Sequence, residues 1–168
     1  MSNLSRFLQG MKVTVVVVAA LTLAACANKS ALEDSNAMAN AGAATPGSQQ
    51  DFVVNVGDRV FFESDSSELS STAQATLDKQ ARWLQQYGRY SFTVEGHADE
   101  RGTREYNFAL GARRAEVTKE YLAAKGISAS RIKTISYGKE RPVAVCNDIS
   151  CWSQNRRAVT VITGGAKT

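Results

Sequence analysis

The sequence is poor in the residues that mark several classes of protein. Two prolines in 168 residues and an aromatic share of 8% exclude collagen-like and proline-rich chains. His97 is the only histidine, so a zinc enzyme that needs several histidine ligands is excluded. The net charge is only +4, and half of that excess lies on Arg6 and Lys12, which is too little to predict nucleic-acid binding. The 43% of apolar and 21% of charged residues suffice for one folded domain.

The first 25 residues have the pattern of an export signal. A basic segment with Arg6 and Lys12 precedes an uncharged apolar run from residue 13 to residue 25. This run has the length of a signal-peptide core and is too short to cross a bilayer core of about 30 Å as a helix. It ends in the letters LAAC (residues 23–26), which resemble a bacterial lipobox. We therefore expect residues 1–25 to be cleaved and Cys26 to be lipidated. The alternative is an ordinary signal peptide with a chance cysteine.

The segment from Cys26 to residue 50 has no aromatic residue and is rich in alanine, asparagine, serine and glycine. Such a segment buries too little surface to offset its ordering entropy, so we expect a flexible tether and place the folded domain at residues 51–168. Two further cysteines, Cys146 and Cys151, lie in that domain. Export to an oxidising compartment favours a disulfide between them, while free thiols and a metal pair are the alternatives.

The folded part alternates between strand and helix patterns. Strands are expected at 58–62, 90–96, 132–137 and 157–162. One helix is expected to begin with a capping box at Ser71 and Gln74 and to stop near Gly88. A second is expected over 104–124, with Gly126 as its C-terminal stop. This βαβαββ order predicts an α/β, or α+β, two-layer sandwich with the helices on one face of a small mixed sheet.

A charged cluster, residues 96–103, lies where the second expected strand ends and the second helix begins. Such a junction holds a loop on a rigid scaffold, and a helix N-terminus favours an anionic group. Asn107, Leu110 and Arg114 share one face of that helix. A guanidinium on an apolar face needs a partner or a route to water. Arg114 therefore either forms a structural salt bridge or reaches a ligand near the strand ends.

Long motifs in this region carry a family resemblance. They are EGHADERGTREYNFALGARRA (residues 95–115), SYGKERP (136–142) and NRRAV (155–159). Together they resemble the family of OmpA C-terminal-like domains, and within it the lipoproteins that bind peptidoglycan. The resemblance covers about residues 58–163 and extends to the lipobox and tether. It implies the same sandwich fold that the periodicity predicts.

The resemblance also implies a ligand and its site. The family binds the meso-diaminopimelate side chain of the peptidoglycan stem peptide, which ends in an ammonium and a carboxylate on one carbon. Asp99 matches the residue that accepts from the ammonium, and Arg114 matches the bidentate donor to the carboxylate. The remaining implied contacts are Asp65 and the loop residues Arg101, Gly102 and Thr103, with Asn107 and Leu110 as supports.

The implied protein is a non-catalytic lipoprotein without a cofactor. Its lipid would lie in the inner leaflet of a Gram-negative outer membrane, with the domain in the periplasm, where it would tie the membrane to the cell wall. The resemblance names TolB of the Tol system as the protein partner, with a role in envelope integrity and division. The loop from Cys146 to Cys151 departs from the family pattern, which puts the TolB contact in doubt.

Other functions remain open from the residues alone. A wall-anchoring lipoprotein outside the Tol system fits the same motifs, and a flagellar stator-like anchor shares the domain but needs a membrane-spanning helix. A cell-wall hydrolase would use His97, yet no poised nucleophile accompanies it, so we expect His97 to be structural. Arg156 and Arg157 are expected to face opposite sides of a strand, one exposed and one packed near Trp152 or an acid.

Overall fold

The computed structural model describes residues 44–164. The expected signal peptide, Cys26 and the tether as far as residue 43 lie outside the described residues, as do residues 165–168. The compact unit begins at Ala44, before the expected domain start at 51. Among its described residues, no helix is both long and apolar enough to cross a membrane.

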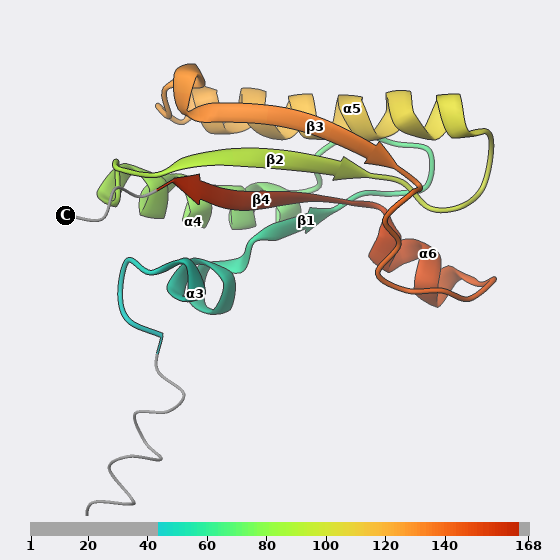
Figure 1. Cartoon of the computed structure of the whole chain (residues 1–168), viewed down its shortest axis with the longest axis horizontal. Helices are drawn as coiled ribbons and strands as arrows, with labels where there is room; N and C mark the ends of the chain where they lie inside the picture. Colours follow the sequence, from blue (N-terminus) through green and yellow to red (C-terminus); the bar gives the residue numbers. More distant parts are fainter. Residues whose placement is uncertain (1–43, 165–168) are drawn as a thin grey trace, which may run out of the picture. The chain divides into compact units, whose positions relative to one another are not determined.

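The domain is built on one mixed sheet of four strands (Figure 1). The strands are β1 (Arg59–Phe61), β2 (Ser91–His97), β3 (Ile132–Gly138) and β4 (Arg157–Gly164). Their order across the sheet is β1-β4-β2-β3. Strand β4 runs antiparallel to both β1 and β2, whereas β2 and β3 are parallel neighbours. Parallel neighbours need a long crossover, and the helix between them supplies it.

Two long helices form the second layer, and their ends follow from capping chemistry. Helix α4 (Ser71–Gln86) begins after Ser70, whose Oγ accepts a hydrogen bond from the backbone N–H of Ala73. The expected cap at Ser71 is therefore wrong by one residue, because Ser70 is the residue that keeps an extended backbone. Helix α5 (Arg104–Ala124) has the expected bounds, and Gly126 ends it with a φ of +93°.

The core lies between the sheet and these helices. Phe92 and Val94 of β2 are fully buried against Leu77 of α4 and Leu122 of α5. Burying such a side chain stabilises the fold by about 1.5–3 kcal/mol each. Helix α5 packs on β2 and β3, and α4 lies beside it, so the two-layer α/β sandwich is confirmed.

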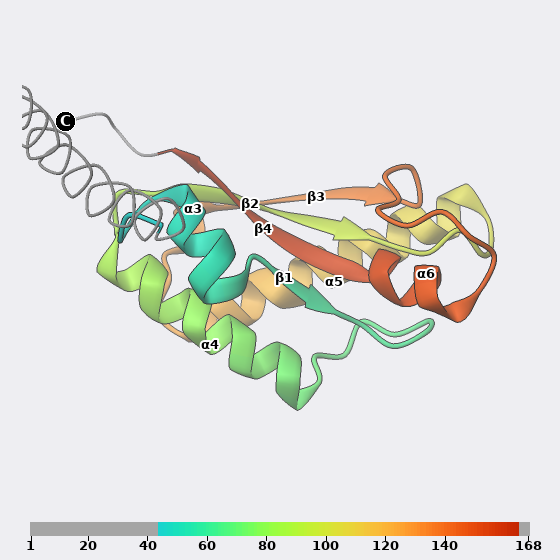
Figure 2. The ribbon, with the colours of Figure 1, turned by 90° about the horizontal axis from the view of Figure 1, so that it is seen from below.

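The chain before β1 is folded rather than part of a tether. Helix α3 (Gln49–Asp51) leads into η1 (Phe52–Gly57), a π-helix, and Figure 2 shows this segment beside α4. The Tyr90 hydroxyl donates to the Gly47 carbonyl at 2.7 Å, and the indole N–H of Trp83 donates to Asp51 at 2.8 Å. Residues 44–50 therefore belong to the domain. Their polar composition misled the sequence prediction because partners far along the chain hold them.

Two further short helices were not expected. The 3₁₀-helix η2 (Ala129–Arg131) precedes β3, and α6 (Ile149–Asn155) lies between β3 and β4. Asp148 caps α6 by accepting from the N–H of Ser150 at 2.8 Å. A disulfide joins Cys146 to Cys151, with a Cα–Cα distance of 5.7 Å. Figure 1 shows α6 at the same end of the sheet as the start of α5.

Candidate functional site

Three connecting segments bring charged residues together at this end of the sheet. Residues 62–66 follow β1, residues 98–103 join β2 to α5, and the junction of α6 with β4 supplies the third segment. Each segment adjoins the end of a strand that is hydrogen-bonded into the sheet, so a rigid scaffold holds these side chains close together.

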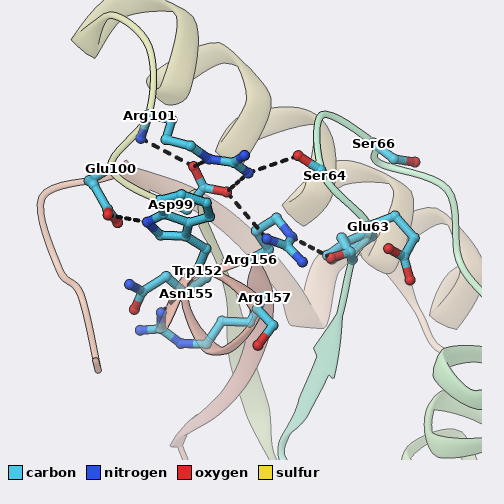
Figure 3. Close-up of polar contacts among 12 residues, drawn as sticks. Glu63, Ser64, Ser66, Asp99, Glu100, Arg101, Trp152, Asn155, Arg156 and Arg157 are labelled. Atoms are coloured by element: carbon cyan, nitrogen blue, oxygen red, sulfur yellow. Dashed lines mark hydrogen bonds and ion pairs between the residues drawn. The ribbon is translucent and has the colours of Figure 1, made fainter. Parts of the chain in front are cut away.

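Asp99 is the centre of this cluster (Figure 3). Its carboxylate accepts from Arg101 at Nε and Nη2, at 3.1 and 2.7 Å, and from the Arg101 backbone N–H at 3.1 Å. Arg156 Nη1 lies 3.5 Å from Oδ2, the same oxygen that accepts from Arg101 Nη2, and Arg156 donates through its Nε to the Phe62 carbonyl. The Arg101 guanidinium also donates to Ser64 at 2.8 Å. One carboxylate is thus held between two arginines.

The pKa of Asp99 reflects two opposed effects. Burial, the largest single influence, raises this pKa, because a buried carboxylate loses its hydration. The hydrogen bonds and charge of Arg101, with a further hydrogen bond from Arg156, together outweigh burial and lower the pKa below its usual value. Asp99 is therefore an anion at neutral pH.

A hollow of about 260 Å³ opens beside this carboxylate. Six of the residues expected in the site line it: Asp65, Asp99, Arg101, Gly102, Asn107 and Leu110. Ser64 and Tyr106 also line it and were not expected. The Tyr106 hydroxyl donates to Oδ1 of Asp65, whose φ of +56° is unusual for a residue other than glycine.

Thr103 and Asn107 have structural positions. The Thr103 Oγ1 accepts from the N–H of Tyr106 at 3.2 Å and so caps α5. The Asn107 side-chain amide donates to the Arg101 carbonyl at 2.7 Å and fixes the loop against the helix. Both therefore shape the hollow by holding the residues 101–103 in place.

Arg114 does not line the hollow. Its side chain is fully buried, and it donates to three backbone carbonyls, those of Glu63, Ser66 and His97, at 3.1, 2.8 and 2.8 Å. Burial, aided by the positive charge of Arg156, lowers the pKa of Arg114 to about 10, so it stays charged at neutral pH. In this arrangement Arg114 holds the segment that carries Asp65.

His97 is buried at the end of strand β2 and was expected to be structural. Among the described residues neither ring nitrogen has a hydrogen-bond partner, and the nearest carboxylate, that of Glu95, lies 3.8 Å from Nε2. Burial, with the charges of Arg157 and Arg141, lowers the pKa of His97 to about 4. The ring is therefore neutral and packs near the Tyr137 ring, at 5.6 Å between centroids.

The expectation that one of Arg156 and Arg157 is exposed is wrong, because both side chains are buried. The expected acid contact is present, since Arg156 lies 3.5 Å from the Asp99 carboxylate. Arg156 ends α6 rather than continuing the strand, so the alternation of a strand does not apply to it. Arg157 begins β4 and donates to the carbonyls of Asn155 and Arg141, at 3.3 and 3.2 Å. Burial is also the largest cause of the lowered pKa of Arg157.

Trp152 and Glu100 complete the cluster, and the sequence prediction missed their contacts with it. The Arg101 guanidinium lies over the Trp152 ring, 4.2 Å from its centroid, and the indole N–H donates to the Glu100 carboxylate. The sequence did offer one signal, a tryptophan close to the NRR motif of residues 155–157. Helix α6 is too short, however, for a periodic pattern to reveal the helix that carries this tryptophan. Within residues 44–164, no group of three or more histidine, cysteine, aspartate or glutamate side chains is arranged to hold a metal ion.

Comparison with known proteins gives a consistent answer. The OmpA family profile matches residues 61–156. A peptidoglycan-associated lipoprotein of Agrobacterium fabrum is 63% identical over 153 residues, covering 89% of this chain and 86% of the relative. One from Brucella melitensis is 57% identical over 157 residues, covering 92% of this chain and 94% of the relative.

Solved structures agree with these sequence matches. The crystal structure of the peptidoglycan-associated lipoprotein from Burkholderia pseudomallei superimposes with a TM-score of 0.65 at 35% identity, covering 69% of this chain and all of that one. The C-terminal domain of Helicobacter pylori MotB has a TM-score of 0.60 at 22% identity, over 65% of this chain and 86% of that one, and so shares the fold. The chain therefore belongs to the OmpA family, among its peptidoglycan-associated lipoproteins.

Proposed function

We propose that this domain binds peptidoglycan non-covalently and without catalysis, through the meso-diaminopimelate of the stem peptide. The end of that side chain carries an ammonium and a carboxylate on one carbon, so its receptor needs an anionic acceptor beside a cationic donor. The observation that carries the proposal is the hollow where Asp65 and Asp99 lie beside Arg101. The names of the relatives, which associate them with peptidoglycan, support it.

Each charged residue has a role in this proposal. The ligand ammonium takes the place of the Arg101 guanidinium at the Asp99 carboxylate, with Asp65 as a second acceptor. Arg101 stays over the Trp152 ring and presents its planar fork to the ligand carboxylate, a geometry that arginine matches with two parallel hydrogen bonds. The exchange leaves Asp99 paired at every stage, which avoids the cost of an uncompensated buried charge.

Arg114 has two possible roles that an experiment separates. The family resemblance assigns the ligand carboxylate to Arg114 itself, which requires the carbonyls of Glu63 and Ser66 to release two of its donors. We propose instead that Arg114 positions the Asp65 segment and that Arg101 receives the carboxylate first. Arg114→Lys keeps the charge but removes the fork, so it distinguishes these roles.

In the cell, we propose that lipid on Cys26 anchors the chain in the inner leaflet of the outer membrane, with residues 27–43 as the tether. The domain would then hold the outer membrane to the wall in the periplasm. Several acyl chains make such attachment effectively permanent. TolB is the proposed protein partner, within a Tol–Pal system that supports envelope integrity and division. Co-purification with TolB from membranes distinguishes this role from wall anchoring outside the Tol system.

The decisive test is a calorimetric titration of the full chain in detergent micelles. The ligands are a muropeptide with diaminopimelate and the same muropeptide with lysine, which lacks the distal carboxylate. We expect binding of the diaminopimelate form only, and a loss of about 2 kcal/mol or more in Asp99→Ala and Arg101→Ala. Arg104→Ala is the matched control, because this exposed arginine pairs with Glu140 at 3.1 Å outside the hollow.

Four outcomes would contradict the proposal or a part of it. Equal affinity for both muropeptides would show that the distal carboxylate is not read, and the absence of any binding would leave TolB as the leading partner. For Arg114→Lys, a loss of discrimination between the two muropeptides would assign the ligand carboxylate to Arg114. Turnover of either muropeptide would overturn the claim that the domain is not an enzyme.

A further inference from the structure

Arg101 is a long side chain at the rim of the hollow, yet its guanidinium is fixed on three sides. One edge donates to Asp99 through Nε and Nη2, and Nη2 also donates to Ser64. One face lies on the Trp152 ring at 4.2 Å (Figure 3). The hydrogen bonds hold the edge of the guanidinium, and the contact with the ring restricts the tilt of its plane. Among the described residues, no hydrogen bond is made by Nη1.

Trp152 is in turn held by a hydrogen bond of its side chain and by the disulfide of its neighbour in the chain. Its indole N–H donates to Glu100, the residue between Asp99 and Arg101 in the chain. The adjacent residue, Cys151, is buried and bonded to Cys146, which ties the first half of α6 to the preceding loop.

The far end of α6 is tied to the same loop. The Asn155 side chain accepts from the N–H of Val143 at 2.8 Å and of Ala144 at 3.2 Å, and it donates to the Ala144 carbonyl at 2.8 Å. A seven-residue helix is too short to be stable on its own, so its position depends on these two ties. The disulfide and the Asn155 side chain thus attach the helix that carries Trp152 to the preceding loop, on either side of Trp152 in the chain.

We infer that Trp152 is a positioning residue for Arg101, and that the Cys146–Cys151 disulfide keeps Trp152 in place for this role. The inference has a physical part, the orientation of Arg101 in the free protein, and a consequence for muropeptide affinity that rests on the proposed function. Trp152 itself does not line the hollow, so its effect on a ligand passes through Arg101.

The test combines a ligand-free measurement with a binding measurement on the full chain in detergent micelles. In the free protein, the NMR resonance of the Arg101 Nε–H reports whether the guanidinium is held. We expect Trp152→Ala to move this resonance to the position of an unrestrained arginine. We expect the same variant to weaken binding of the diaminopimelate muropeptide roughly three- to thirtyfold, the range of a cation–π contact. Trp152→Phe keeps a ring under Arg101 and should recover most of both effects.

Two controls separate positioning from a general loss of structure. Ile149→Ala removes an exposed side chain from the same helix and should change neither readout. Replacing both Cys146 and Cys151 by serine should weaken binding in the wild-type background but not in Trp152→Ala, because the disulfide acts through that ring. An additive effect of the two changes would overturn the link between the disulfide and Trp152.

The two claims fail in distinguishable ways. If the wild-type chain binds no muropeptide, the proposed function fails, and the Arg101 resonance still decides the physical part. An unchanged Arg101 resonance in Trp152→Ala overturns the inference, whatever the muropeptide data show. A shifted resonance with unchanged muropeptide affinity overturns its consequence for binding.

Discussion

Helix α5 reaches the sheet at a contact between two glycines, and this contact gives the sharpest prediction for stability. A Cβ atom on Gly96 of β2 would lie 1.8 Å from the Gly111 carbonyl oxygen and 2.7 Å from its carbonyl carbon. Both atoms belong to the backbone of α5, so no side chain can turn away to make room. Relief requires the helix to move from the sheet by about 1 Å or more, because Cβ atoms essentially never lie within 3.0 Å of another heavy atom.

The size of the effect follows from what such a movement disrupts. Overpacking a core costs about 1–3 kcal/mol when side chains can adjust, and more when they cannot. Replacing glycine by alanine returns about 0.5–1 kcal/mol through the lower entropy of the unfolded chain. We therefore expect Gly96→Ala to lower the free energy of unfolding by at least about 2 kcal/mol. This is a large share of the 5–15 kcal/mol that stabilises a typical domain.

Urea denaturation followed by circular dichroism measures this loss, and Gly111→Ala provides the graded comparison. A Cβ there meets the Ser136 Oγ at 2.5 Å and the Gly96 carbonyl oxygen at 2.9 Å, while alanine gains about 1 kcal/mol of helix propensity. We expect a smaller loss, of about 1–2 kcal/mol, and partial recovery when Ser136→Ala is added. A Gly96→Ala variant within 1 kcal/mol of wild type would refute the reasoning, as would Gly111→Ala being the more damaging change.

Three further predictions concern acid and the disulfide. His97 is neutral in the fold with a pKa of about 4, so between about pH 6.5 and 4 only the unfolded chain binds its proton. Stability should fall by roughly 3 kcal/mol across that window, and His97→Asn should flatten the decline in urea titrations. Asp99 has a lowered folded pKa, so its contribution is present above about pH 3.8 and is lost as the pH falls further. Asp99→Asn should abolish this second decline in stability. If stability below about pH 3.8 falls as steeply in the variant as in the wild type, protonation of Asp99 is not the cause. Serine at both Cys146 and Cys151 should cost about 2 kcal/mol in urea denaturation, and an unchanged midpoint would contradict the stabilising role of this short loop.

The regular part of the fold was open to prediction because its signals are local. Strand β2 shows alternation along its own residues, and α5 carries its cap and its stop within the segment itself. Helix α6 has a local cap at Asp148, but with seven residues it is too short to show a periodic pattern. Its position depends on partners outside the helix, which it reaches through the disulfide to Cys146 and through the Asn155 amide. Residues 44–50 were assigned to the tether for the same reason, since the partners that hold this end of the domain are distant in sequence: Tyr90 lies 43 residues from Gly47, and Trp83 lies 32 residues from Asp51.

The location of the candidate site was easier to predict than its charge pairing. The junction of a strand end with a helix start pointed to residues 96–103, and the family resemblance selected Asp99 and Arg101 within that loop; both line the hollow. The arginine that pairs with Asp99 was harder to predict, because the sequence contains several arginines that could approach it. The structure chooses Arg101 and Arg156, and the latter reaches Asp99 only because α6 ends at Asn155 and turns the chain.

Arg114 shows why a correct physical rule can leave the partner undecided. A guanidinium on the apolar face of α5 was expected to need a partner or a route to water, and it does have partners. They are backbone carbonyls, which every residue carries, so no residue type in the sequence marks them. A salt bridge would instead have used an acidic side chain, which is visible in the sequence. The carbonyls of Glu63, Ser66 and His97 become an arginine site only when β1, β2 and α5 are packed together. The segment that carries Asp65 is thus held by the fold, and a change in its position must change the partners of Arg114.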